Sequence, residues 1–199
     1  MIKFITTLLA LFMFSTSYAK EVKVGIILGF TGPIESLTPG MAAGAELAFN
    51  EASNSGALLG GSTVSSIRAD STCIDSAAAA SAAEFLISQG VTAIMGADCS
   101  GVTGAVLSNV AVPNGVPMIS PSATSPALTT AEDNGLFFRT APSDARGGEV
   151  LADITSDRGI SSVAITYVNT DYGVGLADVY EAAATVSYTH LRAHETMEY

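Results

Sequence analysis

Hydroxyl-bearing residues follow two short apolar runs in the middle of the chain. The run at 91–95 leads into a glycine-containing loop that ends at Ser100, and the run at 116–118 leads into a second loop that contains Ser122, Ala123 and Thr124. In an open parallel sheet, ligands bind beyond the carboxyl ends of the strands. Small hydroxyl groups and accessible backbone suit a small polar ligand better than a phosphate or a nucleic acid. The alternative is that these are ordinary turn residues.

Residue types for enzymatic or metal chemistry are scarce. No histidine occurs between Lys20 and Ala184 to serve as the base of a Ser-His-Asp site, and there is no G-x-S-x-G turn. The segment 29–33 lacks the G-x-G-x-x-G spacing of a dinucleotide site. Carboxylates at predicted strand ends could hold a metal but more often cap a helix; they are Asp70, Asp98 and Asp171. A secreted α/β hydrolase is therefore a distant alternative, and we expect no cofactor or metal.

The chain is strongly acidic. Its 199 residues carry a formal net charge of −11. This charge argues against a nucleic-acid partner, because few cations are present to neutralise a run of phosphates. It equally disfavours binding to an anionic membrane surface.

The N-terminus has the pattern of a signal peptide. Lys3 is followed by an apolar run at 4–14 and by Ser17-Tyr18-Ala19, a small-x-small cleavage site. The run is too short to span a bilayer. We therefore expect residues 1–19 to be removed after Ala19, and the protein to be exported to the periplasm without membrane insertion.

Export determines how the two cysteines are interpreted. Oxidising compartments favour disulfides, whereas metal pairs and nucleophilic thiols are more typical of the cytosol. Cys73 and Cys99 are therefore expected to form a disulfide rather than a metal pair or a nucleophile.

Strand and helix patterns alternate along the chain. Strands are predicted at 22–29, 63–69, 91–95, 116–119, 136–139 and 162–168, and helices at 41–54, 74–89, 101–109, 144–158 and 173–184. Such alternation indicates βαβ units. The expected fold class is α/β, with an open parallel sheet flanked by helices.

Two positions interrupt this pattern. The Ala141-Pro142-Ser143-Asp144 segment suggests a boundary between a first lobe at 20–143 and the beginning of a second at 144–185. The tail at 186–199 has neither helical nor strand periodicity and resembles the translation of a transposon-end sequencing adaptor. We expect it to be non-native, so that its His190/His194 pair has no metal-binding meaning.

Several local motifs occur in a familiar order from residue 21 to 184. They are Thr31-Gly32-Pro33, Asp70-Ser71-Thr72-Cys73, Gly96-Ala97-Asp98-Cys99-Ser100, the string from Ile119 to Thr129, Phe138-Arg139-Thr140 and Asp171-Tyr172-Gly173. In these motifs the chain resembles the first half of a periplasmic binding protein of the branched-chain amino acid (leucine/isoleucine/valine) family.

The resemblance implies a two-lobed clamp that delivers its ligand to the membrane permease of an ABC importer. It implies that Ser100 and Thr124 bind the carboxylate and ammonium of an amino acid, helped by the backbone of Ser122 and Ala123. It further implies that Tyr172 closes over the apolar part of the ligand. Cys73 and Cys99 match the disulfide of the family.

Three departures qualify the resemblance. Leu37 replaces an aromatic residue, Arg146 replaces a glutamine, and the acidic residue that holds the ammonium comes from a later part of the family's sequence. We therefore expect weak or no ligand binding by the 199-residue chain. The alternatives on the same fold are an extracellular sensor or a binder of amides, urea or aromatic acids.

Overall fold

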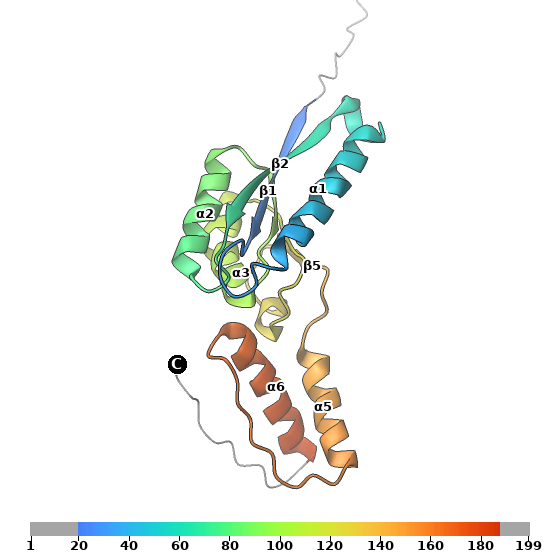
Figure 1. The fold of residues 1–199 in the computed structure, drawn as a ribbon, viewed down its shortest axis with the longest axis vertical. Coiled ribbons are helices and arrows are strands. Elements are labelled where there is room, and N and C mark those ends of the chain that lie inside the picture. The colour runs from blue at the N-terminus through green and yellow to red at the C-terminus, as the bar shows by residue number, and fades with distance from the viewer. Residues whose placement is uncertain (1–19, 188–199) are drawn as a thin grey trace, which may run out of the picture.

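The computed structural model describes residues 20–187, which include one parallel sheet of five strands in the order β2-β1-β3-β4-β5 (Figure 1). The strands are β1 (Glu21–Leu28), β2 (Thr63–Asp70), β3 (Ala93–Gly96), β4 (Met118–Ser120) and β5 (Phe137–Arg139). This confirms the predicted α/β class and parallel sheet. The predicted signal peptide, His190 and His194 lie outside the described residues.

Helices cover both faces of the sheet. The helices are α1 (Thr38–Asn54), α2 (Ser76–Ser88), α3 (Ser100–Val106), α4 (Val112–Asn114), α5 (Ala145–Asp157) and α6 (Asp171–Ser187). Figure 1 shows α1 on one side of the sheet, α2 and α3 on the other, and α5 beside α6 beyond one end of it. Between residues 20 and 187, no helix combines the length and the apolar character needed to cross a membrane.

The position of β1 inside the sheet explains why its sequence is continuously apolar. Ile26 and Leu28 pack with α1, whereas Ile27 packs with α2 and α3, and all three are fully buried. Successive side chains of a strand point to opposite faces, so a strand covered on both faces needs apolar residues at every position.

The helix predicted at 101–109 is longer than its pattern indicated. After α3 it continues through a π-helical turn, η2 (Leu107–Ala111), into α4, and it ends at Gly115, which has φ +65°. Pro113 lies in this last turn and has no N–H to donate to the preceding turn. A wider turn before it accommodates the proline without breaking the helix.

The strand predicted at 162–168 is not formed. Val163 and Ile165 are half-buried against the pair α5–α6, while Ala164 and Thr166 are exposed, as the alternating pattern indicated. However, the backbone of 161–167 makes no hydrogen bond to any described residue. A strand needs a neighbour to complete its ladder, and no other described segment pairs with this one.

Candidate functional site

The carboxyl ends of three strands are joined by one buried carboxylate. Asp98, which follows β3, accepts hydrogen bonds from the Gly29 N–H (2.6 Å) after β1 and the Ser71 hydroxyl (3.1 Å) after β2. It also accepts from the Cys99 N–H at 2.9 Å. Asp98 is 3% exposed and does not cap a helix. The carboxylate therefore fixes the relative positions of the loops from which the site is built.

The expected disulfide joins Cys73 and Cys99, with Cα atoms 5.2 Å apart. Cys99 is the N-cap residue of α3, and no side chain caps this helix. The helix predicted at 101–109 starts one residue earlier than expected: Ser100 is the first helical residue and not a cap, because Cys99 already has the extended backbone of a cap (φ −92°, ψ 138°).

A second loop is tied directly to the first. The Ser122 hydroxyl donates to the Asp98 carbonyl (3.0 Å), and the Ser125 N–H donates to the Ser100 hydroxyl oxygen (3.1 Å). Ser120, at the end of β4, donates its hydroxyl to the carbonyl of Ala97. The structure therefore brings Ser100, Ser122, Ala123 and Thr124 together at the carboxyl edge of the sheet.

The hydrogen-bonding groups of these four residues are not equally available. The Ser122 hydroxyl already donates to the Asp98 carbonyl, and the Ala123 N–H donates to the Ser120 hydroxyl oxygen at 3.0 Å. In contrast, within residues 20–187 the N–H and hydroxyl of Thr124 donate to nothing, and neither does the hydroxyl of Ser100. The edge thus presents unpaired donors, which suit an anionic group such as a carboxylate.

Helix α3 adds three further donors to this edge. Within the described part of the chain, the N–H groups of Ser100, Gly101 and Val102 have no acceptor. Such groups at the start of a helix carry partial positive charge and favour anions. The Ser100 hydroxyl proton and the three N–H groups beside it therefore all carry partial positive charge.

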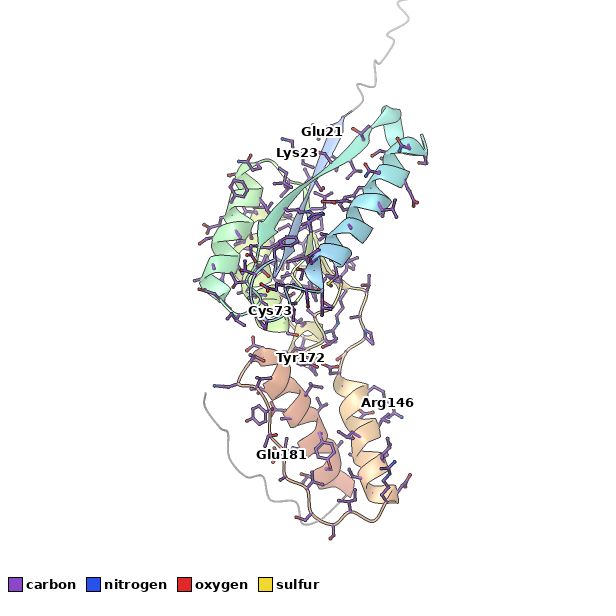
Figure 2. The ribbon with its side chains drawn as sticks, in the orientation of Figure 1. Glu21, Lys23, Cys73, Arg146, Tyr172 and Glu181 are labelled. Carbon is purple, nitrogen blue, oxygen red and sulfur yellow. A yellow bond between two sulfur atoms is a disulfide. The ribbon has the colours of Figure 1, made fainter. Side chains whose placement is uncertain are left out.

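Tyr172 makes no hydrogen bond to Ser100 or to the residues of the second loop within the described part of the chain. Figure 2 shows it at the junction between the sheet and the pair α5–α6. It is 44% exposed and lines an apolar hollow of about 900 Å³ formed by α5, α6 and the segment 163–168. Its neighbour Asp171 does approach the first loop, because a methyl group on Gly101 would lie 3.4 Å from the Asp171 carboxylate.

Two of the three departures from the family pattern, Leu37 and Arg146, lie among the described residues. Leu37 is the N-cap residue of α1 and is 63% exposed. Arg146 lies on the outer side of α5 (Figure 2) and pairs with Glu149 at 2.6 Å. This contact raises the pKa of the Arg146 guanidinium. Neither residue makes a hydrogen bond to the candidate site.

The sequence offered three strand-end carboxylates as metal ligands or, more often, helix caps, and the structure gives two of them another role. Between residues 20 and 187 no group of three His, Cys, Asp or Glu side chains could hold a metal ion. Asp98 is engaged as described, and Asp70 accepts from the Thr31 hydroxyl (2.6 Å) and the Thr72 N–H (2.8 Å). Both carboxylates serve to connect loops.

The environment of Asp70 has a consequence for stability. Burial opposes ionisation of this carboxyl, but the hydrogen bonds from Thr31 and Thr72 outweigh burial and hold the pKa of Asp70 below its ordinary value of 3.8. A depressed pKa in the folded state stabilises the fold at pH values above the ordinary pKa. That contribution is lost as the pH falls through the lower, folded-state pKa.

We therefore expect Asp70→Asn to lower the free energy of unfolding at neutral pH by about 1 kcal/mol, a modest value because the carboxylate is partly exposed. The difference between the wild type and the variant should shrink once the pH falls below about 4, where Asp70 begins to protonate. Urea unfolding at neutral and acidic pH measures the difference in the free energy of unfolding and its decrease at low pH. A difference that stays constant down to the acid limit would contradict this account.

Comparisons with known proteins agree with this geometry. Residues 21–191 match the family model for periplasmic binding proteins. The chain is 33% identical to a Leu/Ile/Val-binding protein homologue of Brucella melitensis over 172 residues, which cover 85% of this chain and 45% of that protein. It is also 33% identical to a chemotactic signal transduction substrate-binding protein of Halobacterium salinarum, over 80% of this chain and 40% of that protein.

A solved structure shows the same arrangement. It is the branched-chain amino acid transporter substrate-binding protein LivJ of Streptococcus pneumoniae in complex with isoleucine. It is 30% identical with a TM-score of 0.73, and the match covers 89% of this chain and 50% of that one. The chain thus spans about half the length of the relatives that it matches.

Proposed function

The chain belongs to the periplasmic binding protein family, and we propose on this basis that it captures a small amino acid of the branched-chain type for an ATP-driven importer. The family consists of binding proteins rather than enzymes, so no catalytic role is assigned. The proposal is supported by one observation above all. Two loops at the carboxyl edge of the sheet are held together so that the hydroxyl groups of Ser100 and Thr124 remain available.

Each site residue has a role in this proposal. Ser100, Thr124 and the first N–H groups of α3 bind the ligand carboxylate. Ser122 and Ala123 shape the loop through their own hydrogen bonds to Asp98 and Ser120. Tyr172 is presented from α6 and covers the apolar part of the ligand when the clamp closes.

The lobe assignment follows from the same proposal. Residues 20–143, which hold the five-stranded sheet, are the first ligand-binding lobe, and residues 144–185 begin the second lobe. The backbone crosses between them at Asp144, whose N–H donates to the Thr124 carbonyl at 3.0 Å. The non-native origin of the tail at 186–199 stays a prediction from its sequence; α6 extends into its first two residues, and the family match reaches residue 191. The protein works in the periplasm with a membrane permease.

Binding is tested by titrating the ¹⁵N-labelled chain with L-leucine, L-isoleucine and L-valine, and in parallel with acetamide and benzoate. Nuclear magnetic resonance detects weak as well as tight binding. We expect the amide signals of Ser100 and Thr124 to shift with the three amino acids. Shifts with acetamide or benzoate alone would replace the proposed ligand class. No shift with any ligand at millimolar concentration would show that the described residues do not capture it without further groups.

The contribution of the Thr124 hydroxyl is tested by Thr124→Val, which keeps the shape of the side chain. A hydrogen bond to a charged group contributes about 1.5–3 kcal/mol, so we expect the affinity for leucine to fall by about tenfold or more. Thr130→Val makes the same chemical change on an exposed residue of the same loop, whose hydroxyl makes only a 3.4 Å contact to Ala127. Equal affinities of the two variants would remove Thr124 from the site.

A second candidate function keeps the ligand and changes the partner. The 33% identity to the chemotactic substrate-binding protein of Halobacterium salinarum supports a sensor role. The two functions differ in the membrane protein that recognises the loaded clamp. Crosslinking in the native cell envelope separates them, because an importer component should be recovered with its permease and a sensor with a signalling receptor.

A further inference from the structure

Helix α6 contacts the loop of Thr124 at a point where the helix has no side chain. A methyl group added to Gly175 of α6 would lie 3.2 Å from the Cδ atom of Pro126 and 3.2 Å from the Oγ atom of Ser125. These two residues directly follow Thr124 in the chain. Side-chain carbons rarely approach their neighbours so closely, so a larger residue at position 175 would force the helix and the loop apart.

This contact depends on packing alone. Within residues 20–187, no hydrogen bond or ion pair joins α6 to the loop at 120–129 or to α3. Asp171, the first residue of α6, lies beside Gly101 of α3, where an added methyl group would be 3.4 Å from the Asp171 carboxylate. Dispersion forces act only over short distances, so the strength of the contact depends on how closely Gly175 lets the helix approach.

A buried hydroxyl group opposes this contact. Ser125 is 2% exposed, and its Oγ atom has no hydrogen-bond partner in the described part of the chain. Its backbone, in contrast, donates to the Ser100 hydroxyl oxygen (3.1 Å) and accepts from Nη1 of Arg139 (2.9 Å). A buried hydroxyl without a partner costs free energy that water would restore. Since Gly175 lies over this Oγ atom, the contact gains stability from packing and loses stability from desolvation.

We propose that Gly175 is a positioning residue: it permits α6 to dock on the loop of Thr124, and the unpartnered Ser125 hydroxyl keeps this docking reversible. Tyr172 lies three residues before Gly175, on the same face of α6, so the docked helix fixes how far Tyr172 stands from the loop. The inference goes beyond the proposed function, because it concerns a contact made without a ligand. Its consequence for binding rests on that function.

The first test measures docking without a ligand, by nuclear magnetic resonance. The nuclear Overhauser effect between the Gly101 Hα and Asp171 Hβ protons reports on the distance between α3 and α6. A reference within the pair α5–α6 is the effect between the Gly148 Hα and Tyr180 amide protons, because a methyl group on Gly148 would lie 2.9 Å from the Tyr180 nitrogen. The ratio of the two intensities therefore follows docking. Absence of the first effect in the wild type would overturn docking itself.

The variant that tests Gly175 is Gly175→Val. We expect the intensity ratio to fall about threefold or more, because overpacking separates the two surfaces and the effect decreases steeply with distance. Gly147→Val is the matched control on α5, since nothing lies within 4 Å of a methyl group added to Gly147, and its ratio should equal that of the wild type. An unchanged ratio in Gly175→Val would overturn the positioning role, whether or not the protein binds an amino acid.

Removing the hydroxyl tests the other half of the proposal. Ser125→Ala deletes one of the two atoms that a side chain at position 175 would meet, and it leaves no polar atom to desolvate. The intensity ratio should therefore not fall in Ser125→Ala, and the double variant Ser125→Ala/Gly175→Val should regain about half of the signal lost in Gly175→Val. A fall in Ser125→Ala alone, or a double variant no better than Gly175→Val, would overturn the role of the hydroxyl.

The consequence for binding is tested with L-leucine and L-alanine, which differ in the apolar part that Tyr172 is proposed to cover. We expect Gly175→Val to weaken L-leucine about tenfold and L-alanine less than about threefold, whereas Gly147→Val should bind both as the wild type does. An equal loss for both ligands would overturn the positioning of Tyr172. If the wild type binds neither amino acid, the described residues do not capture them, and the intensity ratio alone decides the role of Gly175.

Discussion

Replacing Gly96 by alanine is expected to destabilise the protein by about 3 kcal/mol or more, because a side chain at this position collides with the neighbouring strand β1. Gly96 ends β3 with φ +130°, a conformation that residues with a side chain rarely adopt. The added methyl group would lie 2.0 Å from the carbonyl oxygen of Ile27 and 2.8 Å from its Cγ2 atom. Ile27 is fully buried between neighbouring strands and cannot move aside without disturbing the sheet.

Urea unfolding of Gly96→Ala and Gly115→Ala separates the collision from the backbone effect. Gly115 also has positive φ (+65°), but nothing lies within 4 Å of an added methyl group there. Its replacement should therefore cost only about 1 kcal/mol. A loss of stability at Gly96 no larger than that at Gly115 would show that the approach to Ile27 is not limiting. Because Gly96 leads directly into the loop of Ser100, the same variant should also weaken ligand binding.

The fold of residues 20–143 follows from local patterns. A continuous apolar run predicts a strand covered on both faces, and Ile26, Ile27 and Leu28 are covered on both. Alternating strands and helices predict parallel pairing, which places the segments after β3 and β4 at the same edge. The position of Ser100 and Thr124 at one edge of the sheet could therefore be predicted from the sequence alone.

The residues that fix this site could not be predicted in the same way. Asp98 bonds to Gly29 and Ser71, which lie 69 and 27 residues earlier in the chain. Arg139 bonds to a loop that is 14 to 16 residues earlier. Neither interaction has a periodic or compositional signal. A carboxylate at a strand end looks the same whether it binds a metal, caps a helix or joins loops, and only the fold distinguishes these roles.

The error at 162–168 has a different origin. Its apolar, β-branched pattern does describe which side chains face α5–α6, since Val163 and Ile165 are the buried members. A strand, however, is a property of a pair of segments, and hydrogen bonding to a neighbour is not encoded in the segment itself. Local sequence thus predicts the face of such a segment and leaves its partner undefined.

Removing the disulfide is the second change with a large expected effect. Cys73 and Cys99 are 26 residues apart. In the chain-entropy model, a loop of this length contributes about 3.5 kcal/mol to the free energy of unfolding. Because Cys99 is the N-cap residue of α3 and precedes Ser100, we also expect the start of this helix to loosen. The double variant Cys73→Ser/Cys99→Ser should therefore lose stability and exchange the Thr103 amide hydrogen, which donates to the Cys99 carbonyl at 2.9 Å, faster.

Reductant provides the matched control for this prediction. Wild-type protein unfolded by urea in the presence of dithiothreitol should lose about as much stability as the double variant, because both lack the same crosslink. The variant itself should be insensitive to reductant. Exchange at the Ala77 amide, which is held by the Asp75 cap of α2 at 2.9 Å, reports on the neighbouring loop. If the Ala77 amide is as strongly affected as the Thr103 amide, the disulfide supports the whole carboxyl edge rather than α3. If neither changes, Asp98 alone is sufficient to hold these loops.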